Sequence, residues 1–281
     1  MSQEEFSMPH RQSDGLNIYY EVHGQGTPLV MIRGLGSNAD HWYAQTAALA
    51  QYFKVIIFDN RGIARTDDPG GDYTVPAMAA DTVGLMDALE LQKAYVMGLS
   101  MGGMIAQEFA INYPDRIKGL VLVCTHCGGT EKVEPSPEVT ELFKGMILEN
   151  TTEAKVKAAT TLFDRHTLIN SPEIPAYYSE VSLKNPAKTE ILIKQWHAVS
   201  QHDTFDRLQR ITAPTLVVTG SEDLLIPPGN SRILAERIPN AELKVIPHAG
   251  HQVLIEQAAA CNEAILDFLK RCEAHQTIDT D

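Results

Sequence analysis

Ser100 stands in a sequence context that could make it a nucleophile. It is the centre of a G-x-S-x-G pattern, residues 98–102, where a β-branched and aromatic run ends and a helical pattern begins. A serine hydroxyl is a weak nucleophile, so it must be presented on a sharp, strained turn. Small residues two before and two after it let strand and helix pass without a Cβ clash. The N-terminus of the following helix would add positive potential where an oxyanion develops.

A serine nucleophile needs a base, and the base needs an acid that orients it. In an open parallel sheet, all three groups should lie on loops at the carboxyl ends of strands. Asp223 follows one predicted strand and His251 follows the last one, which gives the chain order Ser, Asp, His. Glu222, adjacent to Asp223, and His248, in the same loop as His251, are the alternatives for acid and base.

Composition limits the classes of partner and cofactor. A formal net charge of −13 argues against nucleic acid and against anionic membrane surfaces, but it does not by itself identify a substrate. The ten histidines show no H-x-x-x-H or H-E-x-x-H spacing, so no metal is predicted. Cys124 and Cys127 have C-x-x-C form, but no second pair follows, which favours packing at a strand end over zinc or redox chemistry.

The chain shows no signal for export or membrane insertion. Residues 1–12 are polar and charged, and the longest apolar runs, such as 120–124, have only strand length. The four cysteines are therefore expected to be free thiols, and the protein is expected in a reducing cytoplasm.

The elements that must position these residues alternate between strand and helix. Near-continuous apolar strands indicate a parallel sheet that is buried on both faces by helices. The predicted strands are 16–22, 28–32, 54–58, 94–97, 117–124, 215–219 and 243–246, and the predicted helices are 41–49, 75–89, 101–113, 231–237 and 253–271.

The alternation stops between residues 131 and 210, where helical patterns punctuated by prolines dominate. We expect a core formed by 1–130 and 211–281, with 131–210 inserted as a helical subdomain. The helices predicted within it are 138–148, 153–163, 174–183 and 189–199.

Residues 16–269 together resemble the α/β-hydrolase superfamily. The turn 98–102 around Ser100, called the elbow, the loop that carries Asp223 and the loop that carries His251 agree with the superfamily in order and context. The resemblance implies a mostly parallel eight-stranded sheet with the helical insertion as a cap. The superfamily patterns G-x-x-D and H-x-G-H favour Asp223 over Glu222 and His251 over His248. The catalytic residues implied are Ser100, Asp223 and His251.

The resemblance also implies an oxyanion hole made by the backbone N–H groups of Leu35 and Met101. The superfamily commonly has H-G-x-G in the first of these loops, and Arg33 stands in place of the histidine. Arg33 could contact an anionic substrate or pair with a nearby carboxylate such as Asp40 or Asp59, and we expect the ion pair. Residues 59–67 resemble the D-x-R-G-x-G-x-S segment of the superfamily, with Ala64 and Thr66 as departures, and should fix this loop. Trp196 is the substrate-contact candidate of the cap.

The elbow region 98–107 looks most like that of capped bacterial esterases and 3-oxoadipate enol-lactonases. This likeness implies a cofactor-free serine hydrolase that cleaves a carboxylic ester or lactone through an acyl-enzyme. The alternatives are a cofactor-free perhydrolase or carbon–carbon bond hydrolase on the same triad, or a non-catalytic ligand-binding protein on the same scaffold. Assembly into a homo-oligomer stays open.

Overall fold

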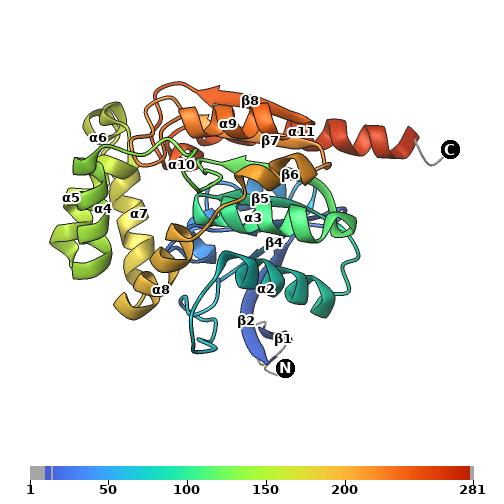
Figure 1. Ribbon diagram of the computed structural model, residues 1–281, viewed down its shortest axis with the longest axis horizontal. Helices are drawn as coiled ribbons and strands as arrows, with labels where there is room; N and C mark the ends of the chain where they lie inside the picture. The colour runs from blue at the N-terminus through green and yellow to red at the C-terminus, as the bar shows by residue number, and fades with distance from the viewer. Residues whose placement is uncertain (1–9, 14, 279–281) are drawn as a thin grey trace, which may run out of the picture.

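The computed structural model describes residues 10–13 and 15–278, which fold around one eight-stranded sheet (Figure 1). The strands follow the order β1-β2-β4-β3-β5-β6-β7-β8. All pairs from β4 to β8 are parallel, and only the β1–β2 and β2–β4 pairs are antiparallel. The bounds are β1 His10–Ser13, β2 Leu16–His23, β3 Pro28–Ile32, β4 Lys54–Phe58, β5 Ala94–Leu99, β6 Ile117–Val123, β7 Thr215–Gly220 and β8 Ala241–Ile246. The predicted α/β-hydrolase fold is therefore confirmed.

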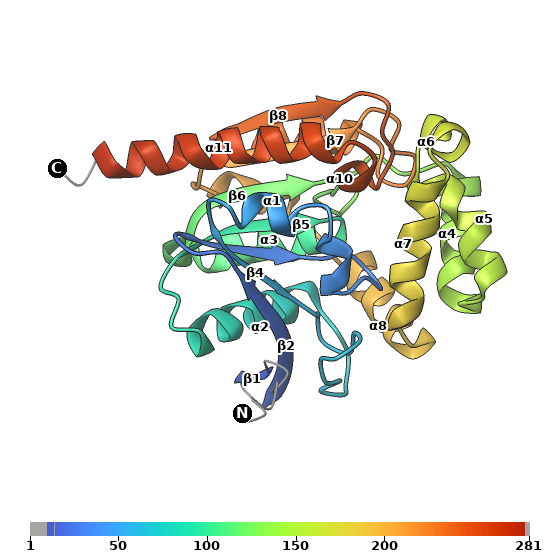
Figure 2. The ribbon, with the colours of Figure 1, turned by 180° about the vertical axis from the view of Figure 1, so that it is seen from behind.

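Helices cover both faces of this sheet. Helices α2, α3 and α9 lie in front of it in Figure 1, and α1, α10 and α11 lie in front in the reverse view of Figure 2. Their bounds are α1 Thr46–Leu49, α2 Val75–Ala88, α3 Met101–Asn112, α9 Gly229–Arg237, α10 Val253–Glu256 and α11 Ala258–Ile278. The predicted single helix 253–271 is thus two helices separated at Gln257, and the second extends to Ile278.

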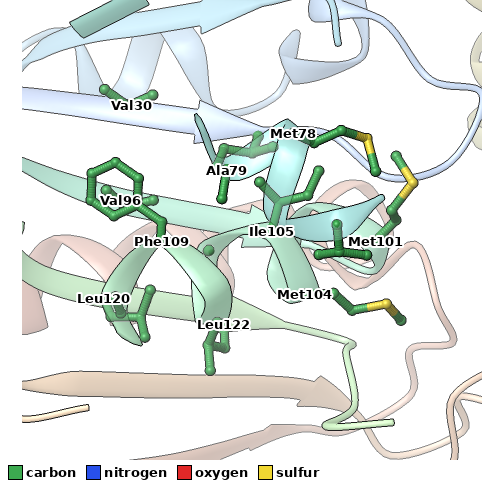
Figure 3. Close-up of a cluster of buried hydrophobic side chains, with 14 of the residues drawn as sticks. Val30, Met78, Ala79, Val96, Met101, Met104, Ile105, Phe109, Leu120 and Leu122 are labelled. Atoms are coloured by element: carbon green, nitrogen blue, oxygen red, sulfur yellow. The ribbon is translucent and has the colours of Figure 1, made fainter. Parts of the chain in front are cut away.

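Two buried clusters explain why central strands such as β3 are apolar at every position. In β3, Val30 and Ile32 belong to the cluster under α2 and α3, part of which is shown in Figure 3. Leu29 and Met31 point the other way, into the cluster under α11. Successive strand side chains point to opposite faces, so covering both faces requires an unbroken apolar run. Each fully buried aliphatic side chain contributes roughly 1.5–3 kcal/mol to this packing.

Residues 131–210, here called the helical segment, join β6 to β7. Figure 1 places this segment beyond the carboxyl ends of the parallel strands. Its elements are α4 Pro137–Glu149, α5 Thr152–Leu162, α6 Arg165–Asn170, α7 Glu173–Lys184, α8 Thr189–Ser200 and the 3₁₀ helix η3 Phe205–Arg210. Helix α6 was not predicted, because six residues are too few to show a helical period. Its start is capped by the Asp164 carboxylate, which accepts from the His166 N–H.

The four cysteines are free and buried. Among the described residues, none of the helices combines the length and the apolar character needed to cross a membrane.

Candidate active site

Ser100 occupies the turn between β5 and α3 in a strained backbone conformation. Its φ of 56° and ψ of −122° lie in a region that L-residues rarely adopt. The flanking glycines are sterically required. A Cβ at Gly98 would lie 2.1 Å from the Gly102 oxygen, and one at Gly102 would lie 2.1 Å from the Ile32 oxygen. The turn is held by hydrogen bonds from Ser100 N to Val123 O at 2.9 Å and from Thr125 Oγ1 to Ser100 O at 2.8 Å.

His251 and Asp223 form a buried hydrogen-bonded pair. His251 Nδ1–H donates to Asp223 Oδ2 at 2.9 Å, and the two residues are 3% and 2% exposed. The other oxygen of Asp223, Oδ1, accepts from Leu225 N at 3.0 Å and from Ile226 N at 2.8 Å. These bonds fix the carboxylate, which in turn fixes the imidazole with Nδ1 protonated and Nε2 free to accept a proton. His251 and Ser100 line the same cavity.

Cys124 is a third member of this buried group, and the sequence did not indicate it. It follows β6 with a φ of 43°. Burial and the neighbouring Asp223 charge raise the pKa of the Cys124 thiol well above its ordinary value. The ligand atoms of Cys124, Asp223 and His251 lie within 4.8 Å of one another. The thiol therefore keeps its proton beside the carboxylate, whereas a metal ligand must be the thiolate.

The alternative acid and base lie elsewhere. Glu222 is exposed and accepts a hydrogen bond from the Ser221 hydroxyl at 3.0 Å. His248 is also exposed, and its ring lies 6.1 Å from the ring of His166. Among the described contacts, neither Glu222 nor His248 is bonded to His251.

The loop after β3 lies directly against Ser100. A Cβ at Gly34 would be 3.1 Å from the Ser100 Cβ. Within the described part of the chain, the backbone N–H groups of Leu35 and Met101 have no hydrogen-bond acceptor. Gly36, the next residue in the loop, donates its N–H to Gln195 Oε1 of α8 at 2.9 Å. Free amides beside a nucleophile are suited to stabilise an oxyanion.

Arg33 is fully buried, and the expected ion pair with Asp40 or Asp59 is wrong. Both carboxylates pair with Arg65 instead, at 2.9 and 2.7 Å, because Arg65 extends from the same loop as Asp59. Arg33 Nη2 donates to Gln252 Oε1 at 3.4 Å, and its guanidinium lies 4.9 Å from the centre of the Trp42 ring.

Two nitrogens of Arg33, Nε and Nη1, have no partner among the described residues. Burial lowers the pKa of the Arg33 guanidinium. Arg33 lines neither of the cavities described below.

Residues 59–67 fix the loop after β3, as expected from the resemblance. Asp59 Oδ1 accepts from the Ala39 N–H at 2.7 Å, and Asn60 Nδ2 donates to the Arg33 carbonyl at 3.0 Å. The segment therefore acts on the backbone that carries the Leu35 amide.

Two cavities meet at Ser100, and both are also lined by Leu35 and Phe143. The first cavity has a volume of about 150 Å³ and the second about 170 Å³, each comparable with an engineered cavity that holds benzene. The first cavity is further lined by Gly34, Gly36, Ser37, Leu99, Met146, Asn150, Thr152, Lys155, Val156, Ala159, Leu162, Phe163, Tyr178, Ser179, Ser182, Leu183, Ala187, Leu192, His251 and Gln252. The second is further lined by Met101, Met104, His126, Lys132, Val133, Glu134, Pro135, Thr140, Trp196, Val199, Ser200, Leu225 and Ile226. Trp196 thus faces a cavity beside the nucleophile.

Comparison with known proteins agrees with this geometry. A family model described as the alpha/beta hydrolase fold matches residues 27–258, and the chain belongs to that family. The chain is 34% identical, over 91% of its length and 96% of the relative's, to a Caulobacter sp. (strain K31) protein named "Putative carbamate hydrolase RutD". A thermophilic esterase from Thermogutta terrifontis superposes with a TM-score of 0.81 at 30% identity, over 92% of this chain and 94% of that one. The enol-lactonase from Burkholderia xenovorans LB400 gives a TM-score of 0.83 at 27% identity, over 93% and 100%.

Proposed function

We propose that this hydrolase cleaves a carboxylic ester or lactone through an acyl-enzyme, with Ser100 as nucleophile, His251 as base and Asp223 as acid. The observation that carries the proposal is the 2.9 Å hydrogen bond between His251 Nδ1 and Asp223 Oδ2. It leaves Nε2 as the only basic ring nitrogen of a histidine that shares a cavity with a strained serine.

The first half of the reaction forms the acyl-enzyme. His251 Nε2 takes the Ser100 hydroxyl proton as Oγ attacks the carbonyl carbon. The N–H groups of Leu35 and Met101 stabilise the oxyanion of the tetrahedral intermediate. Asp223 compensates the charge of the imidazolium, which then gives its proton to the leaving alcohol oxygen as the carbon–oxygen bond breaks.

The second half repeats these steps with water. His251 removes a proton from water, the hydroxide attacks the acyl carbon, and Ser100 leaves with the proton returned by His251. We propose that the helical segment acts as a cap in both halves, because residues 131–210 supply most of the residues that line the first cavity. A covered site excludes bulk water and strengthens the electrostatic interactions within it.

The site and two of the relatives support the substrate class that we propose. A serine at the elbow forms an ester intermediate with an acyl group, so the substrate must carry an acyl carbon bonded to a leaving group. An esterase and an enol-lactonase are among the structural relatives, and both names denote cleavage of a carbonyl–oxygen bond. The two cavities of about 150 and 170 Å³ favour a small molecule with a modest group on each side of that bond.

The test is the Ser100→Ala variant, assayed with short p-nitrophenyl esters and with simple lactones. We expect it to fold normally and to lose kcat by roughly 10³-fold or more, because the attacking atom is gone. A fluorophosphonate should label the wild type and leave the variant unlabelled. Ser231→Ala, which removes another buried serine hydroxyl in α9, is the matched control and should keep full activity. More than a tenth of the wild-type kcat in clean Ser100→Ala protein would rule out the proposed nucleophile.

A further inference from the structure

His126 is a half-buried polar residue of the second cavity that the proposed reaction does not use. It lies in the loop after β6, two residues beyond Cys124, and its ring lines the cavity together with Ser100 and Met101. Its side chain is partly accessible, and that accessible surface faces this cavity.

The surroundings of His126 hold it in one position. Its carbonyl accepts from Gln107 Nε2 at 3.1 Å, and its ring Nδ1 accepts from the Gly128 N–H at 3.0 Å. Gly128 has a φ of +75°, and a Cβ there would lie 1.7 Å from the His202 oxygen. Residue 128 must therefore be glycine, and the backbone N–H that orients the imidazole is held in this conformation.

The same contacts fix the tautomer. Because Nδ1 accepts a hydrogen bond from the Gly128 N–H, the proton of the neutral ring must be on Nε2. Nε2 has no hydrogen-bond partner among the described residues. Burial, and then the proximity of His202 and Lys132, lowers the pKa of His126 to about 3. The ring is thus an uncharged donor at neutral pH.

Four other polar side chains of the second cavity already have partners. The Thr140 hydroxyl donates to the Ser136 carbonyl at 3.1 Å, and the Ser200 hydroxyl donates to the His197 carbonyl at 2.7 Å. The remaining charges, Lys132 and Glu134, pair with each other at 3.2 Å. His126 Nε2–H is therefore a neutral side-chain donor that this cavity offers to a bound molecule.

The second cavity fits the acyl part of the substrate. His251 must reach the leaving-group oxygen to protonate it, and His251 lines the first cavity but not the second. The leaving group consequently lies on the side of the first cavity, which leaves the second for the acyl chain.

Resting on the proposed hydrolase function, we propose that His126 Nε2–H binds an oxygen acceptor, a ketone or hydroxyl, carried by the acyl chain. The enzyme then prefers oxygenated acyl groups over plain alkyl ones of equal length. A neutral hydrogen bond in a desolvated pocket accounts for a preference of about tenfold.

The experiment compares p-nitrophenyl hexanoate with p-nitrophenyl 4-oxohexanoate and 5-oxohexanoate, which share a leaving group. The measured quantity is the ratio of kcat/KM for each keto ester to that for the hexanoate. We expect a ratio of about ten for at least one keto ester with the wild type, and a ratio near one with His126→Asn and His126→Phe. Asparagine can still accept from the Gly128 N–H, but its amide is too short to donate at the position of Nε2.

The controls separate this inference from its alternatives. Thr140→Val removes a hydroxyl of the same cavity that is already satisfied, so it should keep the wild-type ratio. A merely structural role of His126 would lower the rates for all three esters by one factor and leave the ratio unchanged, which would overturn the inference. A wild-type ratio near one would also overturn it while leaving the hydrolase function intact. No turnover of any ester would instead defeat the proposed function, and this inference with it.

Discussion

Asp223, the acid we propose, is held by several contacts. Its carboxylate accepts from the His251 N–H and from two backbone N–H groups, and the Cys124 thiol lies close to it in the same buried group. These hydrogen bonds fix the orientation of the carboxylate. A fixed carboxylate lets the imidazole rotate little, which is the main requirement for rapid proton transfer between Ser100 and the leaving group.

Removing this acid should therefore be far more damaging than removing its neighbour. Asp223→Asn should lower kcat by roughly 10³- to 10⁴-fold, because the histidine can take the wrong tautomer and its cation is uncompensated. Glu222→Gln, the matched control, changes an exposed side chain that contacts Ser221 and should stay within about twofold of wild type. Steady-state kinetics with one ester checks both, and a larger loss for Glu222→Gln would reassign the acid.

Arg33 has a different role from the one its charge first indicates. Its side chain lines neither cavity and contacts Gln252, the neighbour of the catalytic base we propose. Arg33→Gln should lower kcat for charged and neutral substrates alike, because the change acts through the position of the Leu35 loop and Gln252.

The measurement compares p-nitrophenyl pentanoate with the mono-p-nitrophenyl ester of glutaric acid. A rise in KM of about tenfold confined to the anionic ester would show instead that Arg33 binds a substrate carboxylate.

Helix α8 of the helical segment contacts the loop after β3, which carries the Leu35 N–H. Gln195 is fully buried in α8 and accepts the Gly36 N–H, one residue after Leu35. Gln195→Met keeps the volume but leaves that amide unpaired, so the loop should shift. We expect kcat to fall by about tenfold with a smaller change in KM, because an oxyanion donor acts mainly in the transition state.

Gln201→Met, an exposed change just after the same helix, should have no such effect on kcat. If the two variants behave alike, α8 does not position the loop.

The sequence predicted elements best where burial alone decides them. The bounds of β3 and β4 match the prediction, since an apolar run covered on both faces has sharp polar ends. Helix α6 and the break between α10 and α11 depend on single capping contacts, such as that of Asp164, and have no period to detect. The order of Ser100, Asp223 and His251 could be predicted because each follows a strand.

Side-chain partners could not be predicted in the same way. The competition between Arg33 and Arg65 for the same two carboxylates is decided by three-dimensional distance, and both residues follow strands that lie side by side. The Cys124–Asp223 contact joins loops 99 residues apart. The unpaired Nε2–H of His126 depends on the backbone conformation of Gly128, whose N–H bonds to the other ring nitrogen. Such contacts leave no periodic signal in the sequence.

For the molecule as a whole, buried neutral histidines make stability depend on pH. The pKa values of His41 and His202 are lowered to about 3, in both cases mainly by burial. The unfolded chain binds these protons near pH 6.5, so the free energy of unfolding should decrease as the pH falls from about 6.5 toward 3. Each histidine contributes a loss of about 1.4 kcal/mol per pH unit in that window.

Urea unfolding between pH 4.5 and 8 measures this slope. His202→Phe should reduce it by about one proton, because neither nitrogen of the His202 ring has a hydrogen-bond partner among the described residues and nothing else is lost. His197→Phe, at an exposed position of α8, is the control and should leave the slope as it is. An unchanged slope in His202→Phe would show that this ring is protonated in the folded protein.

The position of the helical segment in the chain has a consequence for biosynthesis. Ser100 and Leu35 leave the ribosome first, and Asp223 and His251 follow only after residues 131–210 have been made. In a nascent chain, Ser100 is therefore present without His251 while more than a hundred further residues are synthesised. The hydroxyl stays at its weak intrinsic reactivity until β7 pairs with β6 and β8 pairs with β7, which completes the sheet. Appearance of activity during translation or refolding would thus report the docking of these last two strands, and no earlier event.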